Sequence, residues 1–234
     1  MTKAVPSAAS PGIGHPDIDS VAAIFIDAFP RLNADQRRLA LTLYRLLARG
    51  APVSAEKLAK ESRLPVELAL DSLARWPGVF YDNGHAVIGF WGIAIQETTH
   101  HLEIAGGSAY AWCAWDALFI PGLLGMPARV TSTCVETGAA IELEISGNGI
   151  ESRRAPGTMI SFSVPAYADL KMNVTASFCH FVRFLRDHGA GERWIARHDG
   201  TFLLSLDQAS DLGNKVNRAR FRDALYTSTA TDLQ

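Results

Sequence analysis

The stretch YAWCAWD, residues 110–116, lies in a run from Tyr110 to Ile120 that is apolar, rich in aromatic residues and free of Gly and Pro. These features predict a single helix over that run. Residues three apart on a helix share one face, with Cβ atoms about 5–6 Å apart. Cys113 and Asp116 are therefore expected to place a thiol and a carboxylate in one small and mostly dry space.

A second thiol, Cys179, follows in the segment SFC, residues 177–179. Burying a thiolate or a carboxylate is costly, so such a group needs a reason to be there. Two thiols can bind a soft metal through sulfur, and a neighbouring carboxyl can hold a proton to donate. Cys113, Asp116 and Cys179 are the candidate catalytic and metal-binding residues.

Composition narrows the class of protein. The chain has 234 residues, 48% of them hydrophobic, and a net charge of −2, so it gives no electrostatic reason to bind nucleic acid or an anionic membrane. No apolar run reaches the 18 or so residues of a membrane span, and the first residues have no signal-peptide core. Three cysteines fit no disulfide framework. We therefore expect a cytoplasmic protein with free thiols.

The first part of the chain predicts a helical domain. Residues 1–16 are rich in Ala, Ser, Pro and Gly and predict a disordered tail. Residues 17–88 predict a winged-helix-like domain, in which four helices precede a hairpin that turns at residues 82–84. The expected helices cover 17–29, a segment that starts with a capping box at 33–36 and ends at Gly50, a short segment opened by Ser54, and 65–75.

A winged-helix outline suggests DNA binding as an alternative function. The helix that would enter the groove, residues 65–75, carries Glu67 and Asp71 against the single Arg75. A helix that faces phosphates is expected to be basic. The sequence favours a packing domain over a DNA-binding one.

Residues 89–234 predict the catalytic domain. We expect strands at 90–95, 102–104, 129–135, 141–145, 158–164 and 202–206, and helices at 110–120, 173–187 and 207–225, with Pro121-Gly122 breaking the first of these helices. The last helix is expected to carry its Arg and Lys residues on the outer side. The predicted fold class is α+β, a helical N-terminal domain followed by a mixed, largely antiparallel sheet flanked by helices.

At these motifs the chain resembles the bacterial organomercurial (alkylmercury) lyases. The motifs are YAWCAWDALFIPGLLG, then RVTSTC with a TGA turn, then SFC before an aromatic-rich segment. RGAPVS and GIAIQET fall in the family's order, so the resemblance runs from about Leu39 to about Leu225. Cys-x-x-Asp alone is a weak signal, whereas this whole context is specific.

The resemblance implies site roles and partners. The family's two catalytic cysteines fall on Cys113 and Cys179, its catalytic aspartate on Asp116, and its buried structural cysteine on Cys134. His180 stands where some relatives have a second cysteine, and Asp116 where some have Ser. The resemblance implies no organic cofactor, and mercury as substrate and product. It implies that Hg²⁺ passes to external low-molecular-weight thiols or to mercuric reductase, and that Cys113 attacks first.

The residues suit this chemistry without the family name. Hg(II) is soft, so thiolates bind it in preference to nitrogen or oxygen ligands, and a proton must then reach the departing carbon. An ordinary Asp is ionised at neutral pH and is a poor acid. Asp116 can instead take the proton from a thiol whose pKa falls on metal binding, and then pass it to the carbon.

Other interpretations stay open. His100-His101 could suggest a metal site, but adjacent strand residues point to opposite faces. Tyr110 is expected to line the site, Trp112 to lie in the core, and His180 could tune Cys179. The remaining function classes are a metal-responsive winged-helix regulator, a thiol-redox protein, for which Cys-x-x-Cys is missing, and a mercury-binding protein that does not cleave carbon.

Overall fold

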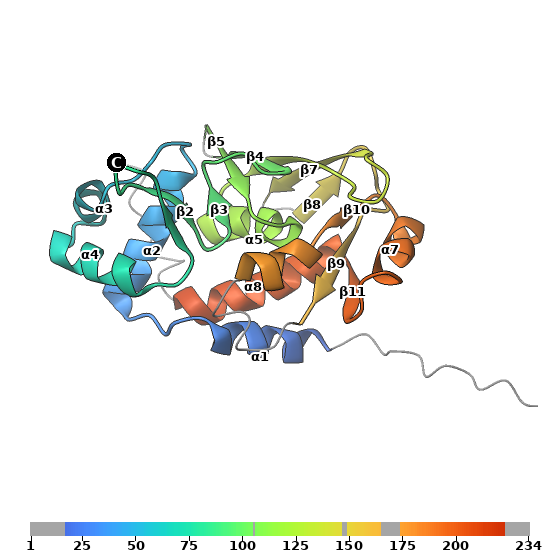
Figure 1. Cartoon of the computed structure of the whole chain (residues 1–234), viewed down its shortest axis with the longest axis horizontal. Coiled ribbons are helices and arrows are strands. Elements are labelled where there is room, and N and C mark those ends of the chain that lie inside the picture. Colours follow the sequence, from blue (N-terminus) through green and yellow to red (C-terminus); the bar gives the residue numbers. More distant parts are fainter. Residues whose placement is uncertain (1–16, 105, 147–148, 165–173, 223–234) are drawn as a thin grey trace, which may run out of the picture.

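The computed structural model describes residues 17–104, 106–146, 149–164 and 174–222 (Figure 1). The predicted tail, residues 1–16, lies outside this range. Within it, the α+β class is confirmed, because helices cover an extended antiparallel sheet. No helix in the described ranges is long and apolar enough to cross a membrane.

Four helices form the first part of the chain: α1 (Ile18–Ala28), α2 (Ala34–Leu47), α3 (Ala55–Ser62) and α4 (Val66–Arg75). Their starts follow the capping residues that the sequence predicts. The Asn33 side chain accepts a hydrogen bond from the Gln36 backbone N–H, and the Gln36 side chain accepts one from the Asn33 N–H. Pro65 is the N-cap of α4 rather than its first helical residue.

The large sheet has eight strands in the order β1-β2-β3-β5-β4-β6-β7-β8, and every pair is antiparallel. The strands are β1 (Val79–Tyr81), β2 (Val87–Phe90), β3 (Ile93–Ala94), β4 (His100–Ile104), β5 (Gly107–Ala111), β6 (Ala128–Thr133), β7 (Ala140–Ser146) and β8 (Gly149–Ser152). The sheet is continuous across residue 88, where the sequence predicts a domain boundary. The division into two domains stays a prediction.

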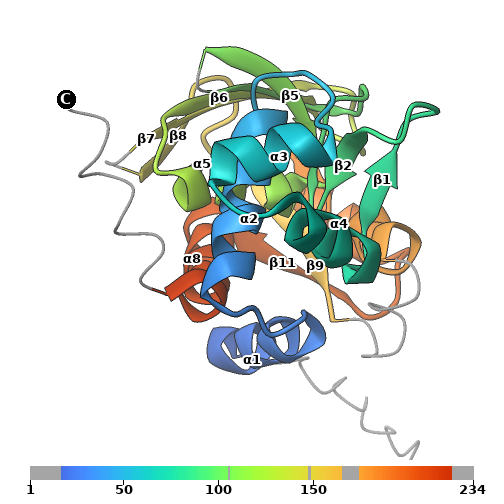
Figure 2. The ribbon, with the colours of Figure 1, turned by 90° about the vertical axis from the view of Figure 1, so that its left-hand side faces the viewer.

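A smaller sheet and the helices α5, α7 and α8 make up most of the remaining described chain. The sheet has the order β10-β9-β11, with β9 (Met159–Ser163), β10 (Phe184–Leu185) and β11 (Thr201–Ser205). The helices are α5 (Ala114–Leu124), α7 (His188–Ile195) and α8 (Leu206–Phe221). Helix α8 contacts both α1 and α5, and Figures 1 and 2 show α1 lying against it on the side away from the large sheet.

The predicted helix over Tyr110 to Ile120 begins later than expected. Gly107–Ala111 forms β5, which pairs with β4 on one side and with β3 on the other. The ladder hydrogen bonds of an inner strand thus override the helical pattern at its first residues. The prediction that Pro121 ends the helix is also wrong, because α5 continues to Leu124 and stops at Gly125, whose φ is 65°.

The predicted helix over 173–187 is largely wrong as well. Residues 174–177 are helical, but Cys179–Phe181 forms a single 3₁₀ turn, and Phe184 and Leu185 form β10 on the edge of β9. Of the apolar residues that suggested a helical face, only Leu185 lies on this strand, and Phe178 and Val182 are buried in the irregular segment before it. Residue 173 lies outside the described range.

Helix α5 is at the centre of the core, with ten of its eleven residues buried. It lies between the large sheet and α8, and Gly213 of α8 packs directly against Phe119 of α5. An ideal Cβ at that position would lie 2.5 Å from the Phe119 Cβ. Only glycine fits there without displacing one of the two helices.

Gly213→Ala is therefore expected to destabilise the chain by about 1–3 kcal/mol, although alanine has the higher helix propensity by about 1 kcal/mol. Urea unfolding measures the difference. Asp211→Ala, at an exposed position of the same helix, is the control and is expected to change the free energy of unfolding by less than about 0.5 kcal/mol. A Gly213→Ala variant as stable as the wild type would contradict this view of the interface.

Candidate active site

Cys113 lies where strand β5 passes into helix α5. It is the N-cap residue, with φ −144° and ψ 173°, and Asp116 is the third residue of the helix. The backbone N–H of Cys113 donates a hydrogen bond of 3.0 Å to Asp116 Oδ2. The spacing of three thus brings the two residues together, as expected, but through helix capping rather than through one helical face.

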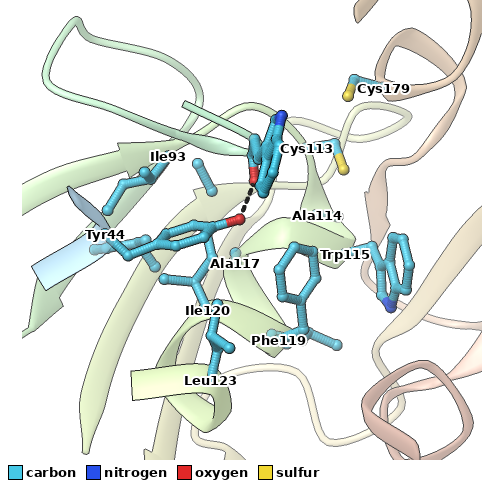
Figure 3. Packing of buried hydrophobic residues seen from close by; sticks show 14 of the residues in the cluster. Tyr44, Ile93, Cys113, Ala114, Trp115, Ala117, Phe119, Ile120, Leu123 and Cys179 are labelled. Atoms are coloured by element: carbon cyan, nitrogen blue, oxygen red, sulfur yellow. Dashed lines mark hydrogen bonds between the residues drawn. The ribbon is translucent and has the colours of Figure 1, made fainter. Parts of the chain in front are cut away.

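Cys179 reaches the same place from the 3₁₀ turn that follows residues 174–177. The two segments are joined by a backbone hydrogen bond of 3.2 Å from the Ala114 N–H to the Val182 carbonyl. The Cys179 thiol lies 4.0 Å from Asp116 Oδ2. Figure 3 shows the side chains of Cys113 and Cys179 near each other, on these two segments.

The three side chains form a compact set of possible metal ligands. One ligand atom from each of Cys113, Asp116 and Cys179 lies within 4.8 Å of the other two, and no other such group occurs among the described residues. Two sulfurs and one carboxylate suit a soft metal such as mercury.

All three groups are buried, and burial raises the pKa of each of them. Burial raises the pKa of Asp116 to about 7, against hydrogen bonds from the Cys113 thiol and backbone N–H that lower it. Burial also raises the pKa of Cys113 well above its usual value, and the hydrogen bond with Cys179 adds to this. A hydrogen bond from Cys113 lowers the pKa of Cys179, but burial and the charge of Asp116 outweigh it and leave the pKa raised.

At neutral pH the site therefore holds two protonated thiols beside a carboxyl group that is part ionised and part protonated. A thiol that meets a metal ion must lose its proton, and Asp116 is the group beside both thiols that can receive it. The arrangement can thus bind a soft metal and carry a proton in the same place.

A cavity of about 370 Å³ opens onto the site. Its wall includes Asp116 and Cys179, whereas Cys113 is wholly covered, with 0% of its surface exposed. The rest of the wall is mainly aromatic and aliphatic, with Phe25, Phe29, Phe80, Trp91, Trp112, Trp115, Phe119, Phe178 and Val216 among its residues. Such a cavity suits the organic part of a small molecule.

Two expectations about aromatic residues are reversed. Trp112, expected in the core, lines the cavity. Tyr110, expected to line it, instead packs on the ring of His101, with 5.1 Å between ring centroids. The reason is that Tyr110 lies within β5 directly opposite His101 of β4, whereas Trp112 lies beyond the end of that strand.

Two residues of the site escaped sequence reasoning. Gly92, with φ 102°, has no Cβ, and an ideal one would lie 2.4 Å from Asp116 Oδ1. Arg220 is buried in the cavity wall, so the expectation that all basic residues of the last helix face outward is wrong. Arg220 follows Val216 by four residues and Leu212 by eight, so it lies on the apolar face of α8. This spacing in the sequence could have indicated its burial.

The other candidates lie apart from the site. Cys134 follows strand β6 and is buried. Burial lowers the pKa of His100 to about 3, and its Nδ1 lies 2.8 Å from Ser132 Oγ. His101 pairs with Ser108 through a contact of 2.7 Å. The side chain of His180, beside Cys179, is exposed.

The chain is similar to known alkylmercury lyases. Residues 93–217 match the family model for alkylmercury lyase. Among curated proteins, the alkylmercury lyase of Pseudomonas putida is 33% identical over 186 residues, which cover 80% of this chain and 86% of that protein. The alkylmercury lyase of Streptomyces lividans is 32% identical over 177 residues, covering 76% and 80%.

Among solved structures, the mercury-bound form of MerB2 superposes with a TM-score of 0.70 at 17% identity, covering 86% of this chain and 98% of that one. This likeness supports the fold. The family model and the sequence relatives show that the chain belongs to the alkylmercury lyase family.

Proposed function

We propose that this organomercurial lyase cleaves the carbon–mercury bond of alkyl or aryl mercurials with Cys113, Cys179 and Asp116, giving a hydrocarbon and Hg²⁺ in mercury detoxification. The single observation that supports these roles is the meeting of two thiols and one carboxyl within 4.8 Å at the end of an apolar cavity. Mercury enters as substrate and leaves as product, and the chemistry calls for no organic cofactor.

The reaction balances with these three groups. A mercurial R–Hg–X, with X a thiolate, loses X⁻ when the first cysteine sulfur bonds to mercury, and the second cysteine sulfur then adds. The two thiols release two protons, one of which leaves with X as HX. Asp116 receives the other and gives it to the carbon. The Hg–C bond breaks as the C–H bond forms, which leaves R–H and Hg²⁺ on two thiolates.

The environment of Asp116 suits it to act as base and then as acid. A general acid–base group works best when its pKa is near the pH at which it operates. Burial raises the pKa of Asp116 to about 7, so the carboxylate is basic enough to accept a thiol proton and the acid is strong enough to return it. The hydrogen bond from the Cys113 N–H keeps Oδ2 beside both thiols.

The cavity favours Cys179 as the first sulfur to meet the mercurial. Cys179 forms part of the cavity wall, whereas Cys113 lies wholly beneath the surface. This order is the reverse of the one that the family resemblance implies. In either order the mercury ends between the same two sulfurs.

Product release needs a competing thiol. Mercury held by two buried thiolates is expected to leave only when external sulfur ligands replace them. A smaller and more open hollow lined by Trp112, Cys179, His180 and Arg183 gives a second approach to Cys179. We infer that low-molecular-weight thiols, or the cysteines of mercuric reductase, take Hg²⁺ from this side.

A mercury-binding protein without lyase activity is the second candidate, because the same two thiols bind the metal whether or not a proton is delivered. A metal-responsive regulator is less well supported. Helix α4 carries Glu67 and Asp71, and Arg75 is paired with Asp71, so no free basic side chain of this helix faces a phosphate.

Turnover separates the lyase from the binding protein. With phenylmercury and excess 2-mercaptoethanol, the wild type is expected to release benzene, measured by gas chromatography. Cys113→Ala, Cys179→Ala and Asp116→Ala are each expected to lower the rate by at least about a hundredfold. Cys134→Ala, which removes the buried thiol outside the site, is the control and should keep the activity. Tight mercury binding by the wild type without benzene would refute the lyase.

The raised pKa of Asp116 also predicts a pH-dependent stability. The folded state holds the Asp116 proton more tightly than the unfolded chain does. The stability that this proton contributes is therefore fully present below about pH 4 and is lost as the pH rises through about 7. A rise of about three pKa units corresponds to about 4 kcal/mol. Urea unfolding should therefore show the wild type losing about 4 kcal/mol relative to Asp116→Asn between about pH 4 and pH 8. A difference that does not change with pH would contradict the buried, weakly acidic carboxyl.

A further inference from the structure

Arg220 is a buried cation in the wall of the cavity that leads to Asp116 and Cys179. Its side chain projects from the last turn of α8, with 9% of its surface exposed. Its guanidinium carbon lies 3.8 Å from the centre of the Phe29 ring and 4.7 Å from that of Trp91. These cation–π contacts hold the guanidinium beside the cavity.

The guanidinium lacks a matching anion in the part of the chain that the structure describes. Its Nε and Nη2 atoms are buried and have no hydrogen-bond partner there. Burial lowers the pKa of Arg220 only to about 10, so the group is charged at neutral pH. Leaving a buried charge unpaired is costly, and a site that bears this cost has a reason to keep the charge.

Asp116 is not that anion. It is the only acidic residue among those that line the cavity in the described chain, but no ion pair joins it to Arg220 there. A cation in contact would lower the pKa of a carboxyl group, whereas the pKa of Asp116 is raised. Both charged groups of the wall thus face the cavity without neutralising each other.

We propose that Arg220 binds a carboxylate that the mercurial complex brings into the cavity, so that this enzyme prefers substrates carrying an anionic group. The inference rests on the proposed lyase function and adds a substrate class to it. The carboxylate can come from the organic group bonded to mercury or from the thiolate that carries the mercurial.

The chemistry of the guanidinium matches this ligand. Nε–H and one Nη–H lie side by side along one edge and form two parallel hydrogen bonds to a carboxylate. The rings of Phe29 and Trp91 contact the guanidinium carbon and offer its N–H groups no hydrogen-bond acceptor of their own. Because Nε and Nη2 are shielded in the structure, binding requires the Arg220 side chain to shift so that this edge meets the cavity.

Three substrate mixtures separate the two sources of the carboxylate. Phenylmercury with 2-mercaptoethanol carries none, 4-hydroxymercuribenzoate with 2-mercaptoethanol carries it on the organic group, and phenylmercury with mercaptoacetate carries it on the thiol. Release of benzene or benzoate gives kcat/KM for the wild type, Arg220→Met and Arg218→Met. Arg218 is exposed on the same helix and is the matched control for a lost charge.

For at least one carboxylate mixture, we expect the wild type and Arg218→Met to show a kcat/KM about tenfold to a hundredfold above that of the neutral mixture. Arg220→Met should lose this preference, mainly through KM, so that its kcat/KM values for the carboxylate and neutral mixtures become about equal. Met matches the stem of Arg in shape and removes a buried charge, so the variant should fold. If it does not, Arg220→Gln supports the same comparison.

An equal preference in Arg220→Met and wild type, or no preference in the wild type, would overturn the role of Arg220. Either result would leave the lyase proposal intact so long as the neutral mixture yields benzene. Absence of benzene from every mixture would instead refute the proposed function. The two failures are therefore distinct.

Discussion

The hydrogen bond from the Cys113 backbone N–H to Asp116 Oδ2 is the constraint on which the site depends. It closes the first turn of α5, and in doing so it turns the carboxyl back toward the residue that precedes the helix. A side chain at this helix position would ordinarily extend into solvent. Here the cap is covered by aromatic and aliphatic residues, so the interaction that starts the helix also buries a proton carrier beside two thiols.

Several segments that are distant in the sequence help to position the Asp116 carboxyl. The turn at Trp91-Gly92, between β2 and β3, lies next to the carboxyl. Its Gly92 carbonyl accepts a hydrogen bond from the Trp112 N–H, and the absence of a Cβ on Gly92 leaves room for Asp116. The Tyr44 hydroxyl donates to the Trp91 carbonyl and fixes that turn from α2 (Figure 3). The helical first part of the chain is thus not only a cover, because one of its buried side chains positions the backbone next to Asp116.

The α+β class, the helix caps of the first part and the pairing of Cys113 with Asp116 were predictable because each depends on local sequence patterns, whereas Cys179 was expected at the site from the family resemblance. Cys113 and Asp116 meet whether they share a helical face or an N-cap, so the error over the start of α5 left the pairing unchanged. Long-range pairing was not predictable in this way. Residues 184–185 form a strand because β9 offers an edge. Trp112 rather than Tyr110 lines the cavity because Tyr110 lies opposite His101 in the sheet, whereas Trp112 lies beyond the end of β5. Arg220 was missed because charge was given more weight than its place on the apolar face of α8.

Asp116 and Arg220, the two charged groups of the described cavity wall, have separate proposed roles, in proton transfer and in substrate selection. Sulfur ligands bind mercury in nearly any mercurial, so the thiols by themselves cannot discriminate among organic groups. Apolar walls discriminate weakly, since a methylene group more or less changes binding by only about 1–3 kcal/mol. A buried cation discriminates more strongly, because a ligand without an anion leaves its N–H groups unpaired. The thiols suffice to capture mercury, so the buried cation of Arg220 is best explained by selection among mercurials.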